Sequence, residues 1–199
     1  MGSFLSAIET LSREELRVLQ LERLKEQVTY VSSRSPYYRR LFRKSRIRPG
    51  DFKDLNDLKK IPFSDKFKIA ESQESKPPFG DLLCVPETEI VKYFRTSGTT
   101  FHPRNFCYTY KDWKHNTVEA MARMKFAIGI RSDDRALIAF PYSTFISLWT
   151  AHYACERIGC MVIPGGGTSS KERLNLMKSM KVTVLCATPT YASHLSNVA

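Results

Sequence analysis

The 199-residue sequence contains no apolar run long enough to cross a bilayer, and its start lacks the basic and then apolar stretch of a signal peptide. Its five cysteines, an odd number, form no C-x-x-C pair, which argues against a zinc knuckle. The four histidines are scattered without metal-ligand spacing. These absences argue against membrane-spanning and zinc-finger classes and predict a protein of a reducing compartment. We expect a cytoplasmic protein with no metal site of its own and no membrane contact.

Acidic residues are also scarce: Asp and Glu total 20 against 31 Lys and Arg, and the net charge is +11. This excess suggests an anionic partner, which could be a nucleic acid, a membrane surface or a phosphate-bearing small molecule. It is densest between Arg34 and Arg48, where no acidic residue occurs. Aromatic side chains stand within the same run: Tyr37, Tyr38 and Phe42. The run fits a surface that binds phosphates and stacks bases, or the solvated face of a helix, which we favour because no nucleic-acid-binding motif accompanies it.

The first part of the chain, residues 1–88, is expected to be helical and rich in turns. Ser12 followed by Glu15 has the sequence of a capping box, and apolar residues then recur at helical spacing. This pattern predicts one amphipathic helix over residues 12–32. A short basic and aromatic helix is expected at 36–44, and brief helices near 55–60 and 65–71.

The second part, residues 89–199, begins with alternating runs at 89–95 and 105–110 that predict the two strands of a hairpin. Thr109 and Asp112 are expected to cap the next helix, and Gly129 to close it. One side of this helix is expected to carry the following residues: Trp113, Thr117, Ala120, Met121, Met124 and Ile128.

Beyond that helix, apolar strands at 136–140, 160–163 and 182–187 alternate with helices at 145–157 and 170–181. Strands that are apolar throughout indicate a parallel sheet covered on both faces. The fold class is therefore predicted as α/β: an N-terminal helical region, a hairpin and a βαβαβ parallel-sheet unit. We place the domains at residues 1–88 and 89–199.

The loop between the two hairpin strands carries the chemistry. Thr96-Ser97-Gly98-Thr99-Thr100 combines hydroxyl donors with a glycine whose backbone freedom lets successive N–H groups converge on an anion. Arg95 and Arg104 flank the loop with guanidinium groups that can grip phosphate. No Walker A sequence is present. The loop therefore fits a polyphosphate site, although small hydroxyl residues also fill ordinary surface turns.

Together with the Pro103-Arg104 that follows, this loop resembles the phosphate-binding signature of adenylate-forming enzymes. Other stretches resemble, in the same order, the N-terminal portion of the phenylacetate–CoA ligases within that superfamily. They lie at residues 19–24, 35–39, 61–63, 78–80, 110–113, 162–164 and 188–189. The resemblance covers nearly the whole chain and implies a partial large domain of an adenylate-forming enzyme.

The resemblance implies that the parent protein is an AMP-forming acyl- or aryl-CoA ligase, which uses ATP and Mg²⁺ to activate a carboxylate as an acyl-adenylate and then transfers it to CoA. It implies a nucleotide phosphate site at the matching residues: Thr96, Ser97, Gly98, Thr99, Thr100 and Arg104. It implies an acyl or aryl pocket at three further matches: Tyr142, Phe145 and Gly167. The implied partner is a small carboxylic acid of aryl or arylacetic type rather than a nucleic acid, and the implied assembly is a homodimer.

These pocket residues also have plainer interpretations. Tyr142 and Phe145 could pack in the core, and residues 165–167 could form an ordinary strand-to-helix turn. His152 and Glu156 lie one helical turn apart and are expected to form an ordinary surface pair.

Two departures from the family pattern affect the functional expectation. Phe101 stands where the superfamily usually has a glycine. The family's adenine-binding motif, ribose-binding aspartate and catalytic lysine come later than the matched stretches, so we expect a truncated chain with no catalytic residue and no activity of its own. The alternatives are a non-catalytic basic module that binds nucleotide or nucleic acid, and a degenerate homologue.

Overall fold

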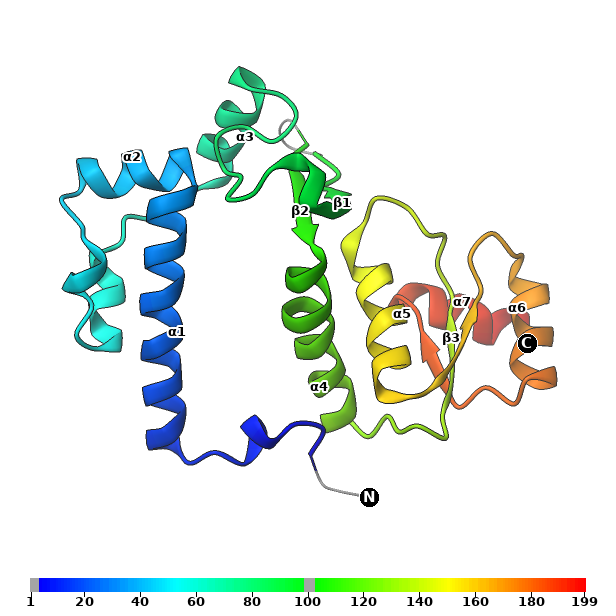
Figure 1. Cartoon of the computed structure of the whole chain (residues 1–199). Helices are drawn as coiled ribbons and strands as arrows, with labels where there is room; N and C mark the ends of the chain where they lie inside the picture. The colour runs from blue at the N-terminus through cyan, green and yellow to red at the C-terminus, as the bar shows by residue number, and fades with distance from the viewer. Residues whose placement is uncertain (1–3, 99–102) are drawn as a thin grey trace. The chain divides into compact units, whose positions relative to one another are not determined.

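The computed structural model describes residues 4–98 and 103–199, which form two compact units. One unit comprises Ala7–Tyr110, and the other comprises Lys111–Ala199 with residues 4–6 (Figure 1). The predicted α/β class, with helices first, then a hairpin and then a parallel sheet, is confirmed. The domain division at residue 88 stays a prediction.

The first unit contains the expected helices and the hairpin. Its long helix α1 begins with the predicted capping box: the Glu15 N–H donates to Ser12 Oγ (3.2 Å), and the Ser12 N–H donates to Glu15 Oε2 (2.7 Å). The hairpin strands pair antiparallel, with Arg95 opposite Asn105. The elements of this unit are η1 (Ala7–Thr10), α1 (Arg13–Arg34), α2 (Pro36–Lys44), η2 (Pro49–Asp51), η3 (Leu55–Lys60), α3 (Lys66–Ser75), η4 (Glu87–Glu89), β1 (Ile90–Arg95) and β2 (Asn105–Thr109).

Helix α2 packs its apolar side on α1. Phe42 is buried with Val28 and Val31 of α1, and Tyr38 packs against the same cluster. The basic side chains of the run remain exposed: Arg34, Arg39, Arg40, Arg43, Lys44, Arg46 and Arg48. Two of the aromatic residues that could have stacked on bases are therefore part of the packing between α1 and α2.

The second unit is built around a parallel sheet in the order β4-β3-β5. Leu137 in the central strand lies opposite Ile163 on one side and Leu185 on the other, and it is fully buried. Gly159 ends α5 in the left-handed conformation, at φ +101°. The elements are η5 (Asp112–Val118), α4 (Glu119–Ala127), β3 (Arg135–Ile138), α5 (Ile146–Ile158), β4 (Met161–Pro164), α6 (Ser170–Ser179), β5 (Val184–Cys186) and α7 (Pro189–Val198).

The helix after the hairpin begins earlier than expected. Helical structure starts at Tyr110, so Asp112 lies inside the helix and the predicted cap at Asp112 is wrong. Within the helix the Asp112 carboxylate accepts a hydrogen bond from the side-chain amide of Asn116 at 3.4 Å. The side chain of Asp112 thus faces the next turn rather than the helix start.

The buried face of this helix also differs from the prediction. Its first part, η5, is π-helical, and a π turn takes one more residue than an α turn. The side that starts at Trp113 therefore continues five residues later at Val118, and then at four-residue spacing through Ala122 and Phe126. Ile128, which the α-helical spacing placed on the same side as Trp113, is 74% exposed.

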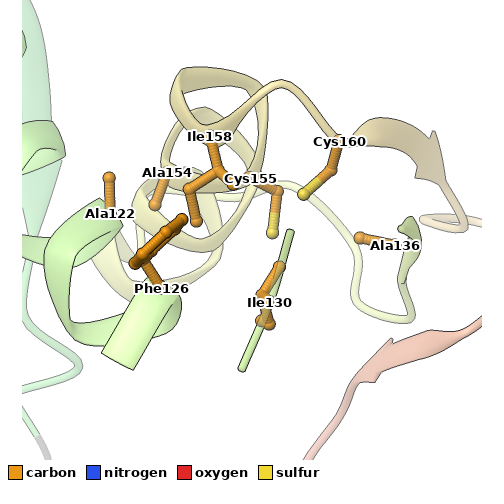
Figure 2. Packing of buried hydrophobic residues seen from close by; sticks show 8 residues of the cluster. All are labelled: Ala122, Phe126, Ile130, Ala136, Ala154, Cys155, Ile158 and Cys160. Carbon is orange, nitrogen blue, oxygen red and sulfur yellow. The ribbon is translucent and has the colours of Figure 1, made fainter. Parts of the chain in front are cut away.

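The core of the second unit lies between α4, α5 and the sheet (Figure 2). Its members are Ala122, Phe126, Ile130, Ala136, Ala154, Cys155, Ile158 and Cys160. A hydrogen bond with Cys186 together with burial raises the pKa of the Cys155 thiol, and burial raises that of Cys160. These two cysteines are core residues, and in such a place a free cysteine behaves as a small apolar side chain. No helix in the two described ranges is long and apolar enough to span a membrane.

Candidate functional site

The mouth of the hydroxyl-rich loop is closed by Thr96. Its backbone N–H donates to the Arg104 carbonyl (3.1 Å), and its hydroxyl accepts the Arg104 N–H (3.0 Å). The hairpin pairing thus extends one step past the strands and brings Arg104 beside the start of the loop. Ser97 is exposed, and Gly98 has φ +67°, a conformation that favours glycine. Thr99 and Thr100, also predicted to bind phosphate, lie outside the described residues, as does Phe101.

A glutamine on α3 holds the other side of the loop's base. The Gln73 side-chain amide donates to the Asn105 carbonyl (2.8 Å) and accepts the Asn105 N–H (2.9 Å), much as a neighbouring strand would. Gln73 is only 8% exposed. The Asn105 side chain is held as well, because its amide donates to the Pro78 carbonyl (2.7 Å) and its oxygen accepts the Tyr93 hydroxyl (2.8 Å). The residue next to Arg104 is therefore fixed by both its backbone and its side chain.

We expect Gln73→Leu to lower the free energy of unfolding of the chain by about 2 kcal/mol, because it leaves the Asn105 N–H and carbonyl without these partners. Urea denaturation followed by circular dichroism measures the loss, and hydrogen exchange of the Asn105 amide localises it. Gln27→Leu is the control, because Gln27 is an exposed glutamine on α1 and its replacement should change stability by less than about 0.5 kcal/mol. Equal losses of stability for the two substitutions would contradict a stabilising role for the hydrogen bonds between Gln73 and Asn105.

The second group of predicted site residues lies at the carboxyl-terminal edge of the parallel sheet. Residues 139–145 follow β3, and residues 165–169 follow β4, so both segments leave the sheet at the same edge. They touch closely: a Cβ on Gly166 would lie 2.6 Å from the Phe140 carbonyl oxygen and 3.2 Å from Tyr142 Cδ2. Gly167 has φ +79°, and among the described residues it has no neighbour within 4 Å of a Cβ position. Two of the predicted pocket residues, Tyr142 and Gly167, are thus within one small region.

Tyr142 is oriented by α5. Its hydroxyl lies 2.6 Å from His152 Nδ1, and its ring centroid lies 4.9 Å from that of Trp149. Burial, with a smaller contribution from the Glu156 carboxylate, raises the pKa of Tyr142 to about 12. The predicted pair of His152 and Glu156 is confirmed, with 3.0 Å between Nε2 and Oε1. Phe145 precedes α5 and is 49% exposed, so it is not a core residue.

A network that the sequence did not indicate fixes the turn after β4. Arg173, on α6, is only 8% exposed. Its Nε donates to the Gly165 carbonyl (2.8 Å), and its guanidinium also donates to the Tyr191 hydroxyl on α7. Ser170 Oγ lies 3.1 Å from the Tyr191 hydroxyl and 3.2 Å from His194 Nε2. Burial favours a higher pKa for Tyr191, but the hydrogen bonds from Ser170 and Arg173 outweigh it, so the pKa lies below its usual value. These contacts join α6 and α7 to the turn at residues 165–167, which we call the glycine turn.

The described residues contain no group of three His, Cys, Asp or Glu side chains that could hold a metal ion. The hydrogen-bond donors at the hairpin loop and at the sheet edge include hydroxyls, backbone N–H groups and guanidinium groups. Such donors suit an anion, and they suit a metal only as a complex with a phosphate ligand. The hairpin loop is therefore chemically suited to binding an anion, and the sheet edge is suited to contact with a partly apolar group.

Comparison with known proteins identifies relatives of the chain. No protein-family model matches the chain. The phenylacetate–coenzyme A ligase of Aromatoleum evansii is 36% identical over 190 residues, which cover 94% of this chain and 41% of that protein. The enzyme of the same name from Thermus thermophilus is 36% identical over 189 residues, and that from Escherichia coli is 34% identical over 191.

Solved structures of an acyl-CoA ligase also match the chain. A crystal structure of 2-hydroxyisobutyryl-CoA ligase with 2-HIB-AMP and CoA, in the thioesterification state, matches with a TM-score of 0.91 and 32% identity. The match covers 100% of this chain and 42% of that one. An open conformation of the same ligase matches with a TM-score of 0.87. The chain spans less than half the length of these relatives. It belongs to the phenylacetate–coenzyme A ligase family and corresponds to an N-terminal portion of its members.

Proposed function

We propose that the chain supplies the phosphate-binding loop and part of the acyl site of an AMP-forming acid–CoA ligase. The observation that carries the proposal is the match over 100% of the chain to a ligase crystallised with an acyl-adenylate and CoA. The activity belongs to the full-length protein, by which we mean the complete product of the gene that encodes this sequence. The 199-residue chain alone spans 41% of the first relative, and we expect it to show no turnover.

The reaction has two steps. A carboxylate oxygen attacks the α-phosphorus of ATP, the bond to the bridging oxygen breaks, and pyrophosphate leaves. The CoA sulfur then attacks the acyl carbon, the bond to AMP oxygen breaks, and the thiol proton passes to solvent or a base. Mg²⁺ bound with the nucleotide supplies positive charge at the phosphates.

The loop's own task is to hold the β- and γ-phosphates during the first step. Ser97 contributes a hydroxyl, Gly98 a close backbone approach and Arg104 a positive charge, with Thr99 and Thr100 completing the set. Thr96 has a different part, because its hydroxyl already accepts the Arg104 N–H and so fixes the loop's mouth. Donors held in place before the reaction stabilise the charge that develops on the leaving pyrophosphate.

The acyl group would lie at the sheet edge, beside Tyr142, Phe145 and Gly167. The relatives are named for phenylacetate, and the solved neighbour for 2-hydroxyisobutyrate. The aromatic side chains at this edge, Tyr142, Trp149 and Phe145, suit an aryl or arylacetic acid best. For the full-length protein we also propose a homodimer, which light scattering would test.

Carboxylate-dependent exchange of pyrophosphate into ATP tests the proposal. We expect the full-length protein to exchange only when an acid such as phenylacetate or benzoate is present, and to release AMP when CoA is added. No exchange with aryl, arylacetic or short hydroxy acids would overturn the ligase proposal. Strong, salt-sensitive binding of generic DNA would favour the basic-module alternative instead. That alternative is supported less well, because Phe42 is buried and Tyr38 packs against the same buried cluster.

Arg104→Ala in the full-length protein should raise the KM for ATP about tenfold, because one charge-assisted hydrogen bond to phosphate is lost. Steady-state exchange rates at varied ATP measure the change, and the KM for the acid should stay within about twofold. Arg43→Ala is the matched control, because Arg43 is an exposed arginine on α2 outside the loop. An unchanged KM for ATP in Arg104→Ala would contradict the assignment of Arg104.

A further inference from the structure

A continuous chain of hydrogen bonds runs from the sheet edge into α5. The Tyr142 hydroxyl lies 2.6 Å from His152 Nδ1, and His152 Nε2 lies 3.0 Å from Glu156 Oε1. His152 and Glu156 are on successive turns of α5, whereas Tyr142 lies in the segment between β3 and α5. The pair expected to be an ordinary surface contact therefore has a third member at the candidate acyl site.

The proton positions follow from the partners. An ionised carboxylate only accepts hydrogen bonds, so Nε2 of His152 carries a hydrogen and donates it to Glu156. In a neutral imidazole the other nitrogen is then an acceptor, and Nδ1 receives the hydroxyl hydrogen of Tyr142. Tyr142 has a raised pKa, in keeping with a phenol that keeps this hydrogen.

The rest of the Tyr142 ring is held by packing. Trp149 lies one helical turn before His152, and its ring meets that of Tyr142 at 4.9 Å. On the other segment, a Cβ at Gly166 would be 3.2 Å from Tyr142 Cδ2, so the ring lies directly against the glycine turn. The hydrogen bond to His152 therefore removes the remaining freedom of a ring that Trp149 and Gly166 already confine.

We propose that His152, oriented by Glu156, is a positioning residue that fixes the Tyr142 ring for the acid substrate. The inference rests on the proposed function, because it assumes that the acid binds beside Tyr142. Since the hydroxyl hydrogen is already donated, the Tyr142 oxygen offers only lone pairs to the site. It can accept a hydrogen bond from a hydroxyl on the acid, but it cannot donate one to the reacting carboxylate.

The first test uses the 199-residue chain and needs no activity. Two-bond ¹H–¹⁵N spectra of the histidine rings, assigned by the signal lost in His152→Ala, should show His152 protonated at Nε2 and unprotonated at Nδ1. Tyr142→Phe should move the Nδ1 resonance of His152 and leave the other histidines in place. A ring protonated at Nδ1, or no response to Tyr142→Phe, would overturn the hydrogen-bond chain.

The second test is a double-mutant cycle in the full-length protein. His152→Ala should raise the KM for the acid about fivefold, the effect of one hydrogen bond, and leave the KM for ATP unchanged. His152→Asn keeps an acceptor near the Nδ1 position and should restore most of the affinity. In a Tyr142→Phe background, His152→Ala should change the KM by less than about twofold, because its partner is already gone.

The control is His115→Ala, which removes an exposed histidine of η5 and should change neither KM. An equal loss for His152→Ala with and without the Tyr142 hydroxyl, or parallel rises in the KM for ATP and acid, would reduce His152 to a general structural residue. If the wild-type full-length protein activates no acid, the proposed function fails, and so does the substrate-positioning role. The spectra then still decide whether the hydrogen-bond chain exists.

Discussion

Gly166→Ala is expected to lower kcat/KM for the acid about 100-fold in the full-length protein, since a shift of about 1 Å in a positioning element can have that effect. The added Cβ would lie 2.6 Å from the Phe140 carbonyl oxygen, and a backbone atom cannot rotate away. The turn after β4 and the segment that carries Tyr142 must therefore separate. Overpacking of this kind also lowers the free energy of unfolding, here by about 2 kcal/mol.

Both effects can be measured directly. Trp113 and Trp149, the two tryptophans of the sequence, lie in the second unit, so tryptophan fluorescence during urea denaturation reports that unit. Gly129→Ala is the control. Gly129 has φ +105°, but no atom of the described residues lies within 4 Å of a Cβ position, so its replacement strains the backbone by about 1 kcal/mol without a collision. Gly129→Ala should keep the KM for the acid. If the Gly166→Ala protein has the same kcat/KM for the acid as the wild type, the glycine turn is not part of the acid site.

Periodicity predicted most of the elements but not the π turn. From Trp113, an α-helical spacing leads to Thr117, and a π spacing leads to Val118. Apolar residues follow in the next turn in either case, so the sequence does not decide between the two spacings. Packing decides between them: the Trp113 ring meets Tyr153 of α5 edge-on at 5.6 Å, and Phe126 joins the core with Ala154 and Ile158. The choice depends on a partner helix distant in sequence, which local spacing does not report.

The candidate site was predictable where its chemistry is local. Four-residue spacing was enough to predict the pair of His152 and Glu156, and hydroxyl content marked the loop that begins at Thr96. The bond from Tyr142 to His152 was not predictable, because it requires the segment after β3 to fold back onto α5. Gln73 left no signal either: its partner Asn105 is 32 residues away, and a glutamine on a helix is usually exposed.

The second large effect is expected at Gly80. A Cβ there would lie 2.5 Å from Ser72 Oγ, 2.8 Å from the Ser72 carbonyl carbon and 2.9 Å from its oxygen, and Gly80 has φ +67°. Alanine would therefore meet both a collision and an unfavourable backbone conformation, and we expect a loss of about 3 kcal/mol in the free energy of unfolding.

The loss of stability should extend beyond Gly80, because the next residue, Asp81, is bonded to several other segments of the unit. Asp81 pairs with Lys76 (2.8 Å) and Arg40 (2.6 Å), which hold its pKa below the usual value, and its carbonyl accepts the Tyr37 N–H (3.0 Å) and the Ser35 hydroxyl (3.2 Å). Moving Gly80 away from Ser72 displaces these contacts and loosens the α1–α2 corner. Hydrogen exchange measured by mass spectrometry should therefore rise in peptides covering residues 35–40 as well as 72–84.

Gly50→Ala provides the control for Gly80→Ala within the same unit. Within the part of the chain that the structure describes, no atom lies within 4 Å of a Cβ position at Gly50. Gly50 also has no positive φ, so alanine there should change stability by less than about 0.5 kcal/mol. If exchange in Gly80→Ala rises only around residue 80, Asp81 does not couple α3 to the corner between α1 and α2. Because Asp81 bonds the backbone at Tyr37 and the buried hydroxyl of Ser35, we expect the two regions to open together.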